Sequence, residues 1–165
     1  MDFSVWLTSF RELHERARRR LHTSEERALY LEAREQLARS LLAAQGHNLQ
    51  PGASARRNFR VPKGLSVDVS FRSGSVRSRT VDISSGGFSC MLPRAFGGSE
   101  EPSGFVLWLP GQEEEPVVGR ARIVALAGSE DVPRRASFTF AHLGEDDLER
   151  LEMLIFDLAL GYITA

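Results

Sequence analysis

Between residues 65 and 141, apolar and polar residues alternate in short runs that Gly, Ser and Pro separate. This pattern is typical of antiparallel strands with one buried face rather than of a parallel sheet. In the first run, Leu65, Val67, Val69 and Phe71 share one face, and a turn is expected at residues 73–75. The expected strands are 65–71, 76–83, 88–92, 105–109, 117–126 and 136–141. Because a closed sheet has no exposed edges, six short antiparallel strands favour a small β-barrel.

Two amphipathic helices are predicted ahead of the strands. The first is expected over residues 2–21, where apolar residues recur at intervals of three and four: Phe3, Trp6, Phe10, Leu13 and Ala17. Thr23 and Glu26 have the spacing of a capping box, which predicts a second helix over residues 24–44. Its apolar face contains Tyr30, Ala33, Leu37, Leu41 and Ala44. The short connection predicts an antiparallel helical hairpin, which should pack on the barrel or on a second copy of itself to form a dimer.

A third helix is predicted over residues 146–162. Glu145, Asp146 and Asp147 place negative charge at its N-terminus, where the helix dipole favours it. Its apolar face contains Leu148, Leu151, Leu154, Ile155 and Leu158. The expected fold is mainly β with α: an N-terminal antiparallel helical hairpin (1–48), a linker (49–55), and a six-stranded antiparallel barrel domain with a C-terminal helix (56–165).

Composition and residue usage exclude several classes of protein. No apolar run approaches the roughly 18 residues that span a bilayer, and the Arg-rich first twenty residues are unlike a secretory signal, so we expect a cytoplasmic protein without a membrane span. The single cysteine, Cys90, lies in an apolar run, which predicts a buried thiol rather than a disulfide or a reactive group. Cys90 and the four histidines lack metal-ligand spacing, so we expect no metal.

Four arginines, at positions 16, 18, 19 and 20, lie near the end of the first helix. Positive charge is favourable there, and Glu12 and Glu15 can pair with Arg16 and Arg19 at four-residue spacing. These arginines are therefore expected to form a solvated helix face, with a partner-binding surface as the alternative.

Charge is unevenly distributed along the chain. Residues 51–95 hold eight basic and two acidic residues, whereas residues 96–165 hold five and thirteen. A locally basic segment suits a small anionic ligand. Nucleic acid is the competing anion, but the basic segment is short, lacks a helix-turn-helix pattern and precedes an acidic half that would repel a long phosphate backbone. We therefore do not expect nucleic acid as the partner.

Two short segments within the basic stretch carry the functional prediction. Residues 56–60, Arg-Arg-Asn-Phe-Arg, place two arginines four apart after a flexible Pro-Gly-Ala-Ser segment, so both guanidinium groups could reach one ligand. A guanidinium can bind phosphate oxygens or the N7 and O6 edge of guanine through two hydrogen bonds, a geometry that lysine lacks. Residues 82–87, Asp-Ile-Ser-Ser-Gly-Gly, add a carboxylate, a hydroxyl and a glycine turn. Together they indicate a phosphate site for a guanine nucleotide.

The order R-x-x-x-R, followed about twenty residues later by [D/N]-x-S-x-x-G, resembles the PilZ family, a bacterial receptor module for cyclic di-GMP. The resemblance covers residues 55–160. It departs at Ala55, where many relatives carry a further arginine; here the doublet is Arg56-Arg57. All five motif positions are filled, by Arg56, Arg60, Asp82, Ser84 and Gly87.

This resemblance implies a non-enzymatic receptor that binds cyclic di-GMP on the outer barrel wall and signals to a protein partner. The implied binding residues are Arg56, Arg57, Arg60, Asp82, Ser84 and Gly87, with Asn58, Gly86 and Trp108 as further candidates. Trp108 could stack on guanine or pack as an ordinary strand residue. No catalytic constellation or cofactor loop competes with this interpretation. A ligand-free adaptor and a small RNA-binding barrel stay open as alternatives.

Overall fold

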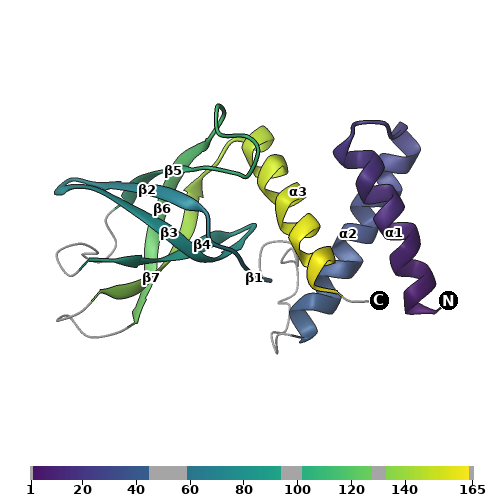
Figure 1. Cartoon of the computed structure of the whole chain (residues 1–165), viewed down its shortest axis with the longest axis horizontal. Coiled ribbons are helices and arrows are strands. Elements are labelled where there is room, and N and C mark those ends of the chain that lie inside the picture. The colour runs from purple at the N-terminus through teal and green to yellow at the C-terminus, as the bar shows by residue number, and fades with distance from the viewer. Residues whose placement is uncertain (1, 45–58, 94–101, 128–132, 164–165) are drawn as a thin grey trace. The chain divides into compact units, whose positions relative to one another are not determined.

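The computed structural model describes residues 2–44, 59–93, 102–127 and 133–163 (Figure 1). Contacts divide the chain into two compact units, one of Met1–Phe59 with Met153–Ala165 and one of Arg60–Glu152. The predicted domain boundaries, near residues 48 and 55, lie outside the described residues.

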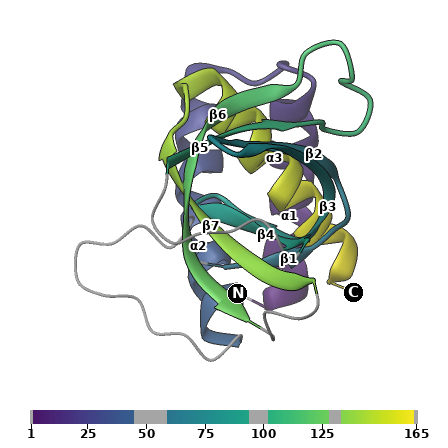
Figure 2. The same ribbon diagram turned by 90° about the vertical axis from the view of Figure 1, so that its left-hand side faces the viewer.

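The second unit is a closed β-barrel, as predicted (Figure 2). Its strands are β1 (Val61–Pro62), β2 (Ser66–Phe71), β3 (Gly74–Ser84), β4 (Gly87–Leu92), β5 (Pro102–Leu107), β6 (Val117–Ala127) and β7 (Arg134–His142). They pair antiparallel in the order β1-β3-β2-β5-β6-β7-β4, and a further pairing of β3 with β4 closes the ring. Six of these strands form the predicted barrel, and β1 adds a two-residue strand beside β3.

Aromatic rings fill the barrel interior. Phe88 stacks on Phe138 at 4.9 Å between ring centroids and meets Phe105 edge-on at 5.5 Å. Val67 and Val69 are fully buried, as the alternation predicted, whereas Phe71 is only half-buried because β2 ends there in its hairpin.

Cys90 is fully buried among the interior residues of β4, as predicted. Burial raises the pKa of its thiol to about 11, because the charged thiolate would lose its solvation inside the barrel. Since the thiolate is the nucleophilic form, this cysteine is an unreactive core residue.

The barrel unit also contains the first half of α3 (Glu145–Tyr162). Arg150 ties this half to the connection between β5 and β6: its guanidinium donates to the backbone oxygen of Glu115 and to Gln112 Oε1, and it pairs with Asp147 within the helix. The predicted helix over 146–162 is confirmed to within one residue.

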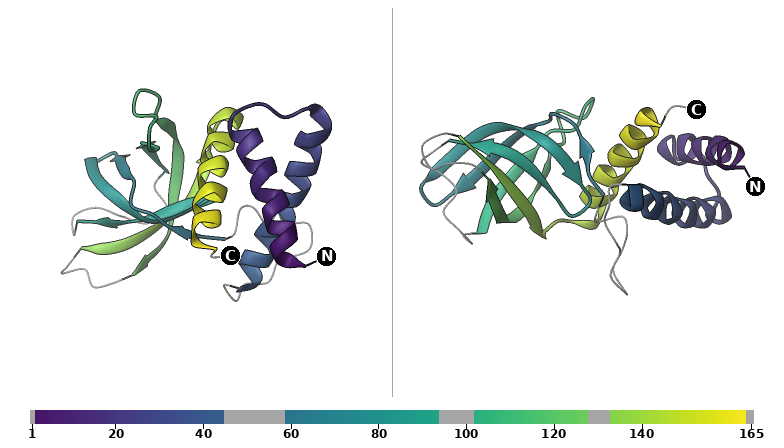
Figure 3. Two further views of the ribbon diagram at one scale, coloured as in Figure 1. Left: turned by 45° about the vertical axis from the view of Figure 1, so that its right-hand side comes forward. Right: turned by 90° about the horizontal axis from the view of Figure 1, so that it is seen from below.

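The first unit contains α1 (Phe3–Arg18), α2 (Ser24–Ala44) and the second half of α3, and α1 and α2 lie side by side in opposite directions (Figure 3). The predicted capping box starts α2: the Thr23 backbone N–H donates to Glu26 Oε1, and the Glu26 backbone N–H donates to Thr23 Oγ1, both at 3.1 Å. None of the helices in the described part of the chain is both long and apolar enough to cross a bilayer.

The basic end of α1 forms surface ion pairs. Glu15 binds both Arg18 and Arg19 at 2.8 Å, so the predicted pair of Glu15 with Arg19 is confirmed. Arg16 pairs with Glu26 of α2 at 3.1 Å instead of with Glu12, because the hairpin brings the start of α2 beside it. All three arginine side chains are about half exposed or more, which fits a solvated face.

The buried helix faces differ from the predicted ones. In α1 the buried residues are Leu7, Phe10, His14 and Ala17, whereas Phe3 is 53% exposed. In α2 they are Tyr30, Arg34, Leu37, Ala38 and Leu42. A prediction from apolar residues alone misses the two buried polar side chains, His14 and Arg34. Their surroundings, however, compensate for the loss of water.

A polar network explains why His14 and Arg34 are buried. His14 Nδ1 lies 2.6 Å from the Tyr30 hydroxyl, and His14 Nε2 lies 3.2 Å from Asp157 Oδ1 on α3. The Arg34 guanidinium lies over the rings of Tyr30 and Phe156, at 5.3 and 4.9 Å from their centroids. The hairpin therefore packs against residues 153–163, where Arg11 also donates to two backbone oxygens of α3 and its end.

The chain is expected to lose stability as the pH falls below about 6.5, the ordinary pKa of histidine. Burial lowers the pKa of His14, Arg34 and Arg18 oppose its protonation, and Asp157 only partly offsets them. The unfolded chain therefore binds a proton that the folded chain resists, so the stability contributed by neutral His14 is lost at lower pH. Urea unfolding at pH 7.5 and 5.5 measures this loss. His14→Gln should reduce the pH dependence, whereas the exposed control His142→Gln should keep it; equal profiles for all three proteins would contradict the assignment.

Candidate functional site

The carboxylate of Asp82 is the centre of the candidate site, on the outer barrel wall where β3 pairs with both β1 and β4. The pairing of β3 with β4 shifts between Thr80 and Asp82, so that Asp82 lies opposite Ser89. Such a bulge redirects the side chains that follow it. Asp82 consequently shares the outer face with Ser89, while Ile83 and Phe88 are buried in the core.

Two arginines hold Asp82, one at each oxygen. Arg60 Nη1 lies 2.7 Å from Oδ1, and Arg135 Nη2 lies 2.5 Å from Oδ2. The Asp82 side chain is only 12% exposed, whereas the arginine side chains are 41% and 45% exposed. A nearly buried carboxylate thus fixes two guanidinium groups that both reach solvent. This arrangement presents positive charge and directed N–H donors, which suit an anionic ligand.

Hydroxyl groups continue the polar network across β4 and β7. Arg60 Nη1 also donates to Ser89 Oγ at 3.2 Å, and Ser89 Oγ lies 3.2 Å from Ser137 Oγ. Ser89 and Ser137 are directly opposite each other in the pairing of β4 with β7. Four separate segments of the chain therefore bring together two partly exposed arginines, one nearly buried carboxylate and two hydroxyls, of which that of Ser89 is fully buried.

The turn between β3 and β4 is held by its own hydrogen bonds. Ser84, 3% exposed, accepts from the Gly86 backbone N–H at 3.2 Å and donates to the Gly87 oxygen at 3.3 Å. The Gly86 oxygen accepts from the Phe140 backbone N–H at 2.9 Å. Ser84 and Gly86 therefore have structural roles in the turn and its attachment to β7, besides any contact with a ligand.

Gly87 permits a close approach of two strands. A Cβ atom at this position would lie 1.8 Å from the backbone oxygen of Phe138 and 2.9 Å from its carbonyl carbon, in β7. The motif predicts Gly87 as a ligand-binding residue. The structure adds a second reason, since only glycine lets β7 run this close to β4.

The remaining predicted site residues fall into two groups. Arg56, Arg57 and Asn58 lie outside the described residues. Trp108 follows β5 beside β2, where its backbone N–H donates to the Ser66 oxygen and the Arg77 guanidinium lies 5.2 Å from its ring centroid. Arg77 is itself held by two hydrogen bonds to Asp68. The structure thus joins Arg60 to Asp82, while Trp108 lies elsewhere on the barrel wall.

Arg135 was not predicted. The predicted strand, 136–141, begins one residue after Arg135, whereas β7 begins at Arg134. In β7 the side chains of Arg135, Ser137 and Thr139 lie on the face away from the buried Ala136 and Phe138. Alternation alone could have shown that Arg135 points outward. That it meets Asp82 depends on the pairing of β7 with β4, which no local pattern specifies.

A closed six-stranded barrel with a C-terminal helix and an arginine–carboxylate cluster on its wall defines the class of this protein as a small β-barrel module. Its family follows from the comparison with family models, in which the PilZ domain matches residues 54–157, more than half of the chain. The chain belongs to the PilZ family. A search of curated proteins found no match.

Solved structures share the fold. The Bacillus subtilis inhibitor of motility MotI/DgrA has a TM-score of 0.57 at 18% identity, over 64% of this chain and 51% of that one. Escherichia coli YcgR in complex with c-di-GMP has a TM-score of 0.52 at 20% identity, over 65% and 47%. MrkH of K. pneumonia has a TM-score of 0.50 at 20% identity, over 70% and 53%. This chain thus matches about half the length of each of these proteins.

Proposed function

We propose that this protein is a cyclic di-GMP receptor that acts on a protein partner. The observation that carries the proposal is the junction of its two sequence motifs: Arg60 from the first and Asp82 from the second meet at 2.7 Å on the outer barrel wall. Membership of the PilZ family and the c-di-GMP complex of YcgR support the same ligand. A receptor of this kind needs no catalytic group.

The proposed binding step exchanges protein partners for ligand partners. Cyclic di-GMP carries two phosphates and two guanines. Arg60 and Arg135 would donate to phosphate oxygens or to the N7 and O6 edge of guanine, and Asp82 would accept the guanine N1 and N2 protons. The ion pairs of the free protein keep these groups aligned, so that little side-chain freedom remains to be lost on binding.

The signalling step follows from where the first motif lies. Arg56, Arg57 and Arg60 occupy the segment that connects α2 to the barrel, and Asn58 lies among them. If these arginines close over the ligand, that segment loses conformational freedom. The range of arrangements open to the helical unit and the barrel then changes, and with it the surface available to a protein partner. Gly87 and Ser84 would support the ligand through the turn that they hold.

Calorimetric titration tests the ligand assignment. Cyclic di-GMP should bind saturably, while two controls should not: GTP, which shares the guanine base but has a linear triphosphate, and cyclic di-AMP, which shares the cyclic phosphodiester ring but has adenine. Binding of all three with equal affinity would indicate general anion binding. No heat with any of them, in a folded sample, would favour the ligand-free adaptor, in which the barrel acts only as a protein-docking surface.

Replacing Arg135 with alanine is expected to lower the affinity for cyclic di-GMP by roughly tenfold, since one charge-assisted hydrogen bond contributes about 1.5 to 3 kcal/mol. Asp82 would keep Arg60 as its partner, so the fold should be retained. Arg122→Ala is the matched control, because Arg122 is an exposed arginine on neighbouring β6. Equal affinities of the two variants, measured by calorimetry, would remove Arg135 from the site.

Self-association through α1 and α2 is a separate proposal. Phe3, Val5 and Leu29 are each more than half exposed on these helices, so they supply apolar surface that a second copy of the hairpin could cover. Analytical ultracentrifugation of the full chain should detect a dimer that Leu29→Glu weakens. A monomer at all concentrations would exclude the dimer.

A further inference from the structure

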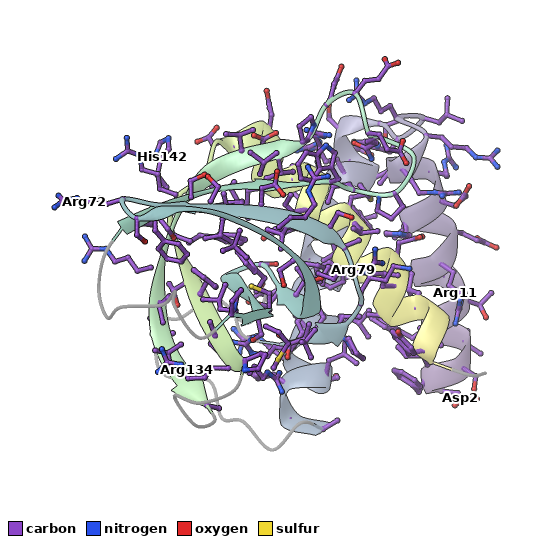
Figure 4. All side chains as sticks on the ribbon, turned by 60° about the vertical axis from the view of Figure 1, so that its left-hand side comes forward. Asp2, Arg11, Arg72, Arg79, Arg134 and His142 are labelled. Atoms are coloured by element: carbon purple, nitrogen blue, oxygen red, sulfur yellow. The ribbon has the colours of Figure 1, made fainter. Side chains whose placement is uncertain are left out.

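A second polar pocket lies on the barrel away from Asp82, where β2 runs into its hairpin and β5 begins. It has a volume of about 320 Å³ and is lined by Ser70, Phe71, Arg72, Ser103, Gly104 and Arg120. Figure 4 shows Arg72 and His142 at this same end of the barrel. None of these residues belongs to either sequence motif.

The strand register explains the hollow. Ser70 of β2 lies opposite Gly104 of β5, Gly104 lies opposite Arg120 of β6, and Arg120 lies opposite His142 of β7. Gly104 thus leaves a position without a side chain in the middle of a row of polar residues. A Cβ atom there would meet nothing within 4 Å, so the space above Gly104 is open.

The rim of the hollow is cationic. Arg120 is exposed, and its guanidinium has no hydrogen-bond or ion-pair partner within the described ranges 2–44, 59–93, 102–127 and 133–163. Arg72 lines the pocket from the hairpin, and the Ser70 hydroxyl, 3.0 Å from that of Ser75, adds a neutral donor. An oxyanion over Gly104 could receive hydrogen bonds from Arg120 and Ser70 at once.

On β5 and β6 the adjacent row of the same wall is apolar, whereas on β2 it holds Asp68, which lies opposite Val106 and is paired with Arg77. Two residues further along each strand, Val106 of β5 lies opposite Val118 of β6, and Val118 is 56% exposed. Two residues along a strand span roughly 6.6 Å, which is also the distance between alternate side chains of an extended peptide. A peptide aligned with β5 could therefore place an acidic side chain over Gly104 and an apolar one on Val106 and Val118.

We propose that this wall is a docking site for an acidic segment of a partner protein, with the pattern acidic-x-apolar. Charge complementarity with Arg72 and Arg120 and the match of row spacing to an extended chain carry the assignment. A nucleotide fits less well, because among the described residues Phe71 is the only aromatic one that lines the pocket, and it is half-buried at the strand end. The proposal stands apart from cyclic di-GMP binding, since it uses neither Arg60 nor Asp82.

The test uses the whole 165-residue chain and a fluorescent peptide of three Glu-Ser-Val-Ser repeats, which places Glu and Val on one face. Fluorescence anisotropy should show saturable binding, and the amide resonances of Gly104 and Val118 should shift. Affinity should fall at least fivefold with Arg120→Gln and with Gly104→Val, which fills the hollow, and less than twofold with Arg122→Gln. Arg60→Ala should leave peptide binding unchanged, which separates this site from the cyclic di-GMP site.

Three outcomes would overturn the proposal. One is the absence of shifts at Gly104 up to millimolar peptide. Another is an equal loss of affinity in Arg120→Gln and Arg122→Gln, which would mean that general positive charge attracts the peptide. The third is a change of ligand preference. A Gln-Ser-Val-Ser peptide that binds as tightly as the Glu-Ser-Val-Ser peptide, or single-stranded RNA that binds more tightly with the same dependence on Arg120, would assign the pocket to another ligand.

Discussion

Replacing Arg60 with alanine is expected to lower the affinity of the protein for cyclic di-GMP by at least about 100-fold. The change removes a guanidinium that is aligned by Asp82 and Ser89. Each charge-assisted hydrogen bond contributes about 1.5 to 3 kcal/mol, so the loss of two to the ligand exceeds about 2.7 kcal/mol, which corresponds to two orders of magnitude. Calorimetric titration of the parent protein and the variant measures the difference.

The same variant should stay folded. The Arg60 side chain is 41% exposed, so solvent screens its ion pair with Asp82, and its removal should reduce the free energy of unfolding by less than about 1 kcal/mol. Asp82 also keeps Arg135 as a partner. Urea unfolding checks this expectation, with Arg122→Ala as the control for the loss of one exposed arginine. Unchanged affinity in a folded Arg60→Ala protein would refute the assigned role of Arg60.

Local sequence patterns identified the six barrel strands and the start of α2, although β5 spans 102–107 where 105–109 was predicted and the short β1 was not predicted. Alternation identified Val67 and Val69 as core residues because strand periodicity depends only on the local chain. The capping box at Thr23 was equally local. The helix faces were harder, since His14 and Arg34 are buried through partners on other helices, and an apolar count cannot include them.

The candidate site divides in the same way. Arg60 and Asp82 could be identified from two motifs, whereas their contact depends on the pairing of β1 with β3. Arg135 contributes equally to holding Asp82, but it lies 53 residues further along the chain. Its place depends on the closure of the barrel by β7 and β4, which is a property of the whole sheet.

The bulge in β3 links the fold to the site. It shifts the pairing of β3 with β4 between Thr80 and Asp82. Thr80 remains buried, and its hydroxyl accepts from the Leu65 backbone N–H at 2.8 Å. Without this shift, strict alternation would turn Asp82 toward the same interior as Thr80, where a carboxylate without these arginines would be strongly unfavourable. One extra residue therefore turns Asp82 away from the core to the outer wall, where it pairs with Arg60 and Arg135.

Replacing Gly87 with alanine is expected to destabilise the barrel by about 3 kcal/mol or more, the upper part of the range for overpacking. The new Cβ atom would lie 1.8 Å from the Phe138 backbone oxygen, and the backbone of β7 cannot move aside as a flexible side chain could. Since domains of this size have about 5 to 15 kcal/mol of total stability, the change is a large fraction of it. Urea unfolding monitored by circular dichroism measures the loss.

Gly104→Ala is the matched control for Gly87→Ala, because Gly104 is also a strand glycine but its Cβ atom would meet nothing within 4 Å. It should leave stability unchanged or slightly higher, as alanine restricts the unfolded chain more than glycine does. Equal stability of the two variants would contradict the close approach of β7 to Gly87. The comparison also bears on function. If Gly87→Ala loses cyclic di-GMP binding only in proportion to its unfolded fraction, then Gly87 serves the ligand through the strand pairing that positions Asp82. A further loss of affinity in the folded fraction would place the ligand directly against the turn.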